Sequence, residues 1–215
     1  ARPVGPAVCR TVVENQGDGR MTSLRPTNPL LSGLMAALLA ISLWQVGEGS
    51  WIVAKARLAQ YLLQRAWIRA LSGEANPKPW PWADTWPVAR LQLNRLAVDE
   101  IVLAGAYGRT LAFGPGHVSS SARPGDRGTV ILTGHRDTHF HFLKAVRPDD
   151  RLELTGTDGT TIHYRVTEQR VLDSRRDGLP MARDSQDVIF VTCFPFDAIT
   201  PGGPLRYVVR AERTD

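Results

Sequence analysis

The chain has 215 residues, and a hydrophobic content of 43% is enough for one packed domain with accessory segments, which excludes a disordered or fibrous protein. Lys and Arg total 26 against 21 Asp and Glu, a net charge of +5. The basic residues are mostly scattered arginines with no run that would follow a phosphate backbone, so we expect no nucleic-acid partner.

The first predicted element is a transmembrane helix over residues 29–48. No charged residue occurs from Pro26 to Gly47, which matches the ~20 residues needed to cross a bilayer. A secretory signal is the alternative, but the small residues that follow are poorly placed for cleavage, which favours an uncleaved anchor. We interpret residues 1–28 as a cytoplasmic or non-native extension, because Met21 opens a more natural translational start than Ala1. Basic residues on both sides leave the orientation open.

Two segments separate this anchor from the expected catalytic domain. Residues 49–73 have apolar residues at helical spacing and basic residues that suit lipid head groups, which predicts a juxtamembrane helix. A simple extension of the anchor helix explains the same pattern. Residues 74–87 are rich in Pro and Trp, and the prolines predict an extended, semi-rigid linker.

Residues 88–215 form a domain of short β-like runs separated by Gly- and Pro-containing turns. The candidate strands are residues 88–93, 100–103, 129–133, 151–155, 161–172, 188–193 and 205–211. A short helical turn is expected near residues 138–146. This pattern predicts an all-β fold with a closed or nearly closed sheet.

Three residues with complementary chemistry lie at the ends of these strands. His135 follows the strand "TVILTG", Cys193 ends "VIFVTC", and Arg206 begins "RYVV". A thiolate nucleophile, an imidazole that transfers protons and a guanidinium that holds an oxyanion make a complete set for acyl transfer. The chain has only one other cysteine, Cys9, so Cys193 belongs to no disulfide framework. A buried, inert cysteine is the alternative on residue type alone.

Three blocks carry a family resemblance: "ILTGHRDTHFHFLKAV", "VTCFPFDA" and "GPLRYVV". They resemble the signature blocks of the sortases, which are membrane-anchored cysteine transpeptidases. The stretches "GRTLAFGPGH" and "PWPWADTWPVARL" resemble the Gram-negative class, class GN. The resemblance covers roughly residues 44–213.

The resemblance implies an eight-stranded β-barrel with His135 as general acid and base, Cys193 as nucleophile and Arg206 as the residue for the substrate carbonyl or oxyanion. It implies cleavage of a C-terminal LPxTG-like sorting signal between Thr and Gly, a thioester on the cysteine, and transfer to an amine acceptor of unspecified identity. The domain would lie on the periplasmic side of the cytoplasmic membrane. No cofactor is implied.

The same comparison gives three further candidates for substrate binding: His117, Thr192 and Phe194. An exposed loop histidine and an ordinary strand threonine are the alternatives for the first two. Phe194 stands where the family often has Tyr, and "VIFV" at residues 188–191 departs from its usual Thr-Leu pair, which affects the expected substrate preference.

Other functions fit the sequence less well. The pattern H-x3-H-x-H at residues 135–141 lacks the remaining ligands and the geometry of a zinc site, so we expect no metal. An L,D-transpeptidase would have a basic residue soon after the cysteine, where this chain has Phe-Pro-Phe. A peptidase that releases its target, and an anchored β-barrel that binds without chemistry, remain as alternatives.

Overall fold

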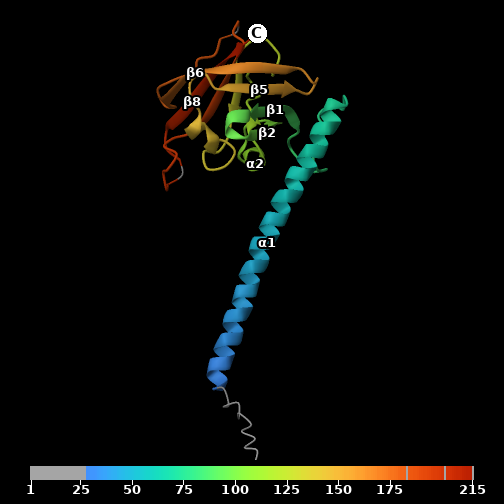
Figure 1. The fold of residues 1–215 in the computed structure, drawn as a ribbon, viewed down its shortest axis with the longest axis vertical. Helices are drawn as coiled ribbons and strands as arrows, with labels where there is room; N and C mark the ends of the chain where they lie inside the picture. Colours follow the sequence, from blue (N-terminus) through green and yellow to red (C-terminus); the bar gives the residue numbers. More distant parts are fainter. Residues whose placement is uncertain (1–27, 183, 201, 215) are drawn as a thin grey trace, which may run out of the picture. The chain divides into compact units, whose positions relative to one another are not determined.

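A computed structural model describes residues 28–182, 184–200 and 202–214. Cys9 and all of the predicted extension except residue 28 lie outside these residues. The chain divides into two units at Gly49, and the second contains every strand (Figure 1).

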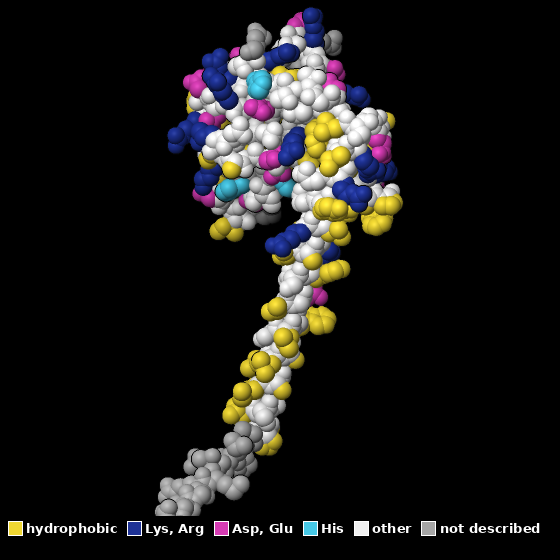
Figure 2. All heavy atoms as spheres, turned by 45° about the vertical axis from the view of Figure 1, so that its right-hand side comes forward, with side chains coloured by type: hydrophobic (Ala, Val, Ile, Leu, Met, Phe, Trp, Pro, Cys, Tyr) yellow, Lys and Arg dark blue, Asp and Glu magenta, His cyan; other side chains and the backbone are white. Residues whose placement is uncertain are grey.

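The N-terminal helix α1 runs without interruption from Pro29 to Leu71. Asn28 caps it, because its side-chain oxygen accepts a hydrogen bond from the amide of Leu30 at 3.2 Å, and Pro29 suits the first helical position. The predicted transmembrane and juxtamembrane helices are therefore one continuous helix, as the alternative of a simple extension supposed. Apolar side chains line it along its length (Figure 2).

Within the described part of the chain, α1 is the one helix whose length and composition would allow it to cross a membrane. A signal sequence near the N-terminus would have the same properties, so this finding is compatible with both an anchor and a signal.

Eight strands form a closed barrel in the order β1-β2-β3-β4-β7-β8-β6-β5. Their bounds are β1 Pro87–Leu93, β2 Val98–Ala104, β3 Gly116–His117, β4 Val130–Thr133, β5 Arg151–Gly156, β6 Thr161–Asp173, β7 Asp187–Cys193 and β8 Leu205–Thr214. The short helices are η1 Asn94–Leu96, α2 Gly108–Leu111 and η2 His141–Ala145. The expected all-β barrel is confirmed.

The sequence pattern missed one strand, β3. Two residues are too few to show the alternation that identifies a strand. Gly116 is needed there because a Cβ atom at this position would lie 2.3 Å from the carbonyl oxygen of Gly105. In the Gly-Pro-Gly sequence, which predicted a turn, the second glycine is therefore required by this close packing.

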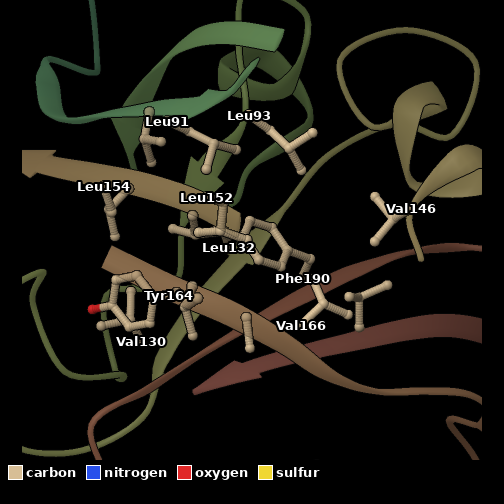
Figure 3. Packing of buried hydrophobic residues seen from close by; sticks show 14 of the residues in the cluster. Leu91, Leu93, Val130, Leu132, Val146, Leu152, Leu154, Tyr164, Val166 and Phe190 are labelled. Atoms are coloured by element: carbon tan, nitrogen blue, oxygen red, sulfur yellow. The ribbon is translucent and has the colours of Figure 1, made fainter. Parts of the chain in front are cut away.

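Strand β7 is buried on both faces, which explains its continuous apolar sequence. Val188 and Phe190 belong to the main core inside the barrel. Figure 3 shows Phe190 among its neighbours there. Ile189 and Val191 point outward and pack against Ile131 of β4 and Val208 of β8. The strand is therefore held rigidly along its length.

The segment between α1 and β1 packs on the barrel, which differs from the expected spacer. Thr85 donates a hydrogen bond to the carbonyl of Ala104 at 2.7 Å, and the amide of Ala104 donates to the carbonyl of Trp86 at 2.8 Å. The C-terminal part of α1 packs there too. Its contacts are made by Leu63, Trp67 and Ala70 against Ile101 and Leu103 of β2.

Asp187 anchors the start of β7. Its carboxylate accepts hydrogen bonds from the Thr129 hydroxyl and the Arg210 guanidinium, both at 2.7 Å, and from Ser185. Burial acts to raise the pKa of Asp187, but the hydrogen bonds from Ser185, Thr129 and Arg210 together outweigh it and lower the pKa below its usual value.

We expect Phe190→Ala to lower the free energy of unfolding by about 3–5 kcal/mol, because the ring is 1% exposed and its removal leaves a cavity. Urea unfolding of the full chain in detergent measures this. Tyr107→Ala is the control, since that ring is 72% exposed and its removal should change stability by less than about 0.5 kcal/mol. An equal effect of the two substitutions would contradict this packing.

We expect Asp187→Asn to lower stability at neutral pH by about 3 kcal/mol, because it removes the buried negative charge to which the partners of Asp187 are hydrogen-bonded. The pKa of Asp187 is lower in the folded state than in the unfolded state, so its carboxylate stabilises the fold. This stabilisation is fully present above the unfolded pKa of about 3.9 and is lost as the pH falls through the folded-state pKa. The difference between wild type and variant should therefore shrink in acid. Urea unfolding across this pH range tests it, with the exposed Asp126→Asn as control.

Candidate active site

Cys193 and Arg206 lie opposite each other on neighbouring strands. The antiparallel register of β7 and β8 pairs these two residues directly. Cys193 is the last residue of β7 and Arg206 the second of β8, so the pair lies where the two strands open into their connecting loop. Both side chains are half-buried.

His135 reaches the same position from the other side of β7. Strands β4 and β7 are parallel, and their register pairs Thr133 with Val191. The ladder continues one residue further, since the amide of Gly134 donates to the carbonyl of Val191 at 3.3 Å. His135 follows two residues after the last pair, in the turn that leaves β4 beside the end of β7. The pairing therefore brings the segment that carries His135 to the same end of β7 as Cys193.

Cys193 and Arg206 share the outer face of the barrel wall. Alternate residues of a strand point to the same side, so Cys193 belongs with Val191 and Arg206 with Val208. Phe190 and Val209, which alternate with these residues, belong to the main core. His135 is exposed, which leaves its imidazole accessible.

An apolar surface continues from the site along this outer face. Its buried members are Ile131, Ile189, Val191 and Val208, and three half-buried residues pack against them: Val118, Leu172 and Leu179. Leu179 belongs to the connection between β6 and β7, which passes over this part of the wall. Cys193 thus stands at the end of an apolar strip that the β6–β7 connection partly covers.

Arg206 is oriented by main-chain contacts. Its Nη1 donates to the carbonyls of Gly203 at 2.7 Å and Leu205 at 2.9 Å. Among the described residues, Nε and Nη2 make no hydrogen bond, so two donors of the guanidinium are available for a further acceptor. The guanidinium therefore keeps donor nitrogens available beside the paired Cys193 thiol.

The turn after β4 is shaped to present His135. Gly134 has no side chain, and a Cβ atom there would lie 2.8 Å from the Phe140 ring, so only glycine lets the turn close over this ring. The carbonyl of His135 accepts a hydrogen bond from the amide of Phe140 at 3.0 Å. The backbone of His135 is thus fixed by a core aromatic residue.

Residues 91–214, more than half of the chain, match the sortase domain, a family defined by its sequence. The chain belongs to the sortase family. It is 25% identical over 124 residues to sortase D of Bacillus subtilis, an alignment that covers 57% of this chain and 62% of that protein. The chain thus matches less than two thirds of this relative's length.

Solved sortase structures share its fold. Sortase D5 transpeptidase of Clostridium perfringens superposes with a TM-score of 0.54 at 21% identity, over 71% of this chain and 89% of that one. Sortase A of Corynebacterium diphtheriae gives a TM-score of 0.56 at 22% identity, over 73% and 84%. Sortase C-1 of Actinomyces oris gives 0.53 at 26% identity, over 60% and 75%.

The three further candidates of the sortase site have different surroundings. Thr192 is buried and its hydroxyl donates to the carbonyl of Gly134 at 2.7 Å, which ties β7 to the turn that carries His135. His117 is 6% exposed, and its Nε2 lies 2.8 Å from the carbonyl oxygen of Ala122, so it holds the connection between β3 and β4. Direct contact of either residue with a substrate stays a prediction.

Phe194 belongs to an aromatic group next to Cys193. Its ring stacks on Tyr207 with centroids 6.1 Å apart and meets Phe196 edge-on at 6.2 Å. Lys144, Pro195 and Asp197 complete a hollow of about 280 Å³ over this group. Phe196 and Tyr207 also pack against the main core, so the group closes this end of the barrel. A role of Phe194 in binding a substrate remains untested.

Sequence reasoning missed Arg136, which has no assigned role in the family blocks. It follows His135 directly, yet its side chain is buried and bonded to the loop between β7 and β8. Nothing local in the sequence distinguishes it from the exposed arginines, because its partners are main-chain carbonyls about 60 residues away. Its neighbour His139 pairs with Glu100 of β2 at 3.1 Å.

We expect Thr192→Val, which has nearly the same shape, to lower stability by about 1–3 kcal/mol, because a buried hydrogen bond to Gly134 is lost. Thr192→Ser keeps the hydroxyl and should retain most of the stability that the hydrogen bond contributes. Thermal unfolding of the full chain in detergent compares the two. Equal stability of both variants would contradict a contribution of this hydrogen bond to the stability of the protein.

Proposed function

We propose that this sortase is a membrane-anchored cysteine transpeptidase that cleaves an LPxTG-like C-terminal sorting signal between Thr and Gly and transfers the acyl group to an amine. The observation that carries the proposal is the register of β4, β7 and β8, which pairs Cys193 with Arg206 and ends the β4 ladder two residues before His135. Family membership supports the same chemistry.

The reaction follows from the chemistry of these three groups. The thiolate of Cys193 attacks the carbonyl carbon of the Thr residue, and a nearby imidazolium or guanidinium favours the charged form of a thiol. The free Nε and Nη2 donors of Arg206 hold the developing oxyanion. His135 gives a proton to the leaving Gly amine, and the C–N bond breaks to leave a thioester.

The second half of the reaction reverses these roles. An amine attacks the thioester, His135 accepts its proton, and the new amide leaves as Cys193 is released. The exposed position of His135 allows an acceptor to approach from solvent. We propose no cofactor for either half, and the chemical identity of the amine is left open.

The apolar strip beside Cys193 supports an apolar sorting signal as the substrate. Leu172, Leu179 and Val118 are half-buried along it, so they offer partly accessible apolar surface to Leu and Pro side chains. His117, Thr192 and Phe194 are proposed to support substrate binding near this strip.

The apolar part of α1 supports a membrane anchor. The cytoplasmic membrane, with the barrel on its periplasmic side, is proposed from the sortase resemblance. Assignment to class GN is part of the proposal and is supported by the segments "GRTLAFGPGH" and "PWPWADTWPVARL". A protein with a sorting signal is the proposed partner.

Incubation of the full chain in detergent with a Leu-Pro-Glu-Thr-Gly peptide should give a thioester adduct on Cys193, detected by intact mass spectrometry. Cys193→Ala should abolish it. His135→Ala and Arg206→Lys should reduce cleavage by about 10²–10⁴-fold, as expected for loss of a proton-transfer or oxyanion group. His163→Ala is the matched control, because this exposed histidine lies on β6 and should leave cleavage unchanged.

Cleavage that survives Cys193→Ala would overturn the proposal. Added triglycine separates the transferase from a hydrolase: a transferase yields the peptide joined to triglycine, whereas a hydrolase yields the free acid. A binding module without chemistry predicts slow alkylation of Cys193 by iodoacetamide at a rate unaffected by His135→Ala.

A further inference from the structure

Arg136 is an unusual arginine, because only 4% of it is exposed. Removing a guanidinium from water is costly unless hydrogen bonds and charges replace the lost hydration. Among the residues that the structure describes, its one carboxylate partner is Asp137, 3.4 Å from Nε, and the Asp137 side chain is 70% exposed. The compensation therefore comes mainly from elsewhere.

The β7–β8 loop, residues 194–204, supplies it. Nη1 of Arg136 donates to the carbonyl of Pro195 at 2.7 Å, and Nη2 donates to the carbonyl of Ala198 at 2.7 Å. Nη2 also lies 3.5 Å from the carbonyl of Thr200. A planar guanidinium has the rigid, spread donors needed to hold several carbonyls of one loop at once.

This loop joins the two other residues of the site. It begins directly after Cys193 and ends just before Arg206, whose Nη1 in turn donates to the carbonyl of Gly203 within the loop. The loop has an exposed middle, since Ile199 is fully exposed. Arg136 directly follows His135, and its side chain binds the loop that separates Cys193 from Arg206.

We propose that Arg136 is a positioning residue of this site: its guanidinium holds the β7–β8 loop in the shape that aligns Cys193 and Arg206 with His135. This inference rests on the proposed acyl transfer for its kinetic consequence. Because Arg136 points away from solvent into the loop, it acts on the rate of the chemical step, and peptide binding along the apolar strip does not depend on it.

The test compares Arg136→Gln and Arg136→Lys with wild type, using the full chain in detergent. Arg95→Gln is the matched control, because Arg95 also donates to a main-chain carbonyl, that of Ala145 at 2.8 Å, and pairs with the buried Asp150. Thermal unfolding, kcat and KM with the Leu-Pro-Glu-Thr-Gly peptide, the alkylation rate of Cys193 and amide hydrogen exchange over residues 194–200 are measured.

We expect both Arg136 variants to lower kcat by about 100-fold with KM changed less than about threefold, as a small misplacement of reacting groups does. Arg136→Lys should not restore kcat, since one ammonium group cannot bind the two loop carbonyls as the guanidinium does. Exchange over residues 194–200 should rise at least about tenfold in both variants. Arg95→Gln should lower Tm but leave kcat and this exchange unchanged.

A lower Tm with unchanged kcat and unchanged exchange over residues 194–200 in either Arg136 variant would overturn the proposal. Rescue of kcat by lysine would also overturn it. If wild type forms no thioester with the peptide, the proposed function fails. The exchange and alkylation measurements still decide the role of Arg136: faster exchange with altered alkylation supports it, and no change in both contradicts it.

Discussion

The parallel pairing of β4 with β7 is the constraint on which this site depends. It brings the turn that carries His135 level with the end of β7, and the antiparallel pairing of β7 with β8 adds Arg206 at the same level. A slip of one residue in either ladder would turn a strand's side chains to the opposite face and separate the three groups. The burial of β7 on both sides opposes such a slip, because residues 188–191 alternate between two apolar cores.

Strand β7 is also held at both ends by polar contacts of different kinds. At its start, Asp187 is bound by the hydroxyl of Thr129 and the guanidinium of Arg210, which join it to the β4 side and to β8. At its end, Thr192 is tied to Gly134, and the following loop is held by Arg136. These buried groups leave little freedom along the strand, so Cys193 is placed by a rigid element that is held at both ends.

Cys193 lies at the edge of the buried part of its strand. Val191 is buried on the same face, whereas Cys193 is one step further along and only half-buried. Arg206 lies opposite it on β8. Membership of the sortase family and this placement agree, and the long apolar helix α1 adds a segment suited to a membrane anchor.

Local patterns in the sequence were sufficient to predict the apolar helix and seven of the eight strands, because strand alternation and turn residues are properties of short segments. His135, Cys193 and Arg206 were singled out by their chemistry at strand ends together with the family resemblance, and their roles stay predictions. The tertiary structure alone decided what depends on distant partners. These features are the two-residue strand β3, the packing of the linker through Thr85, the bond from Thr192 to Gly134 and the burial of Arg136 against main-chain carbonyls. A main-chain carbonyl has no sequence signature, so contacts made to it are visible only once the chain has folded.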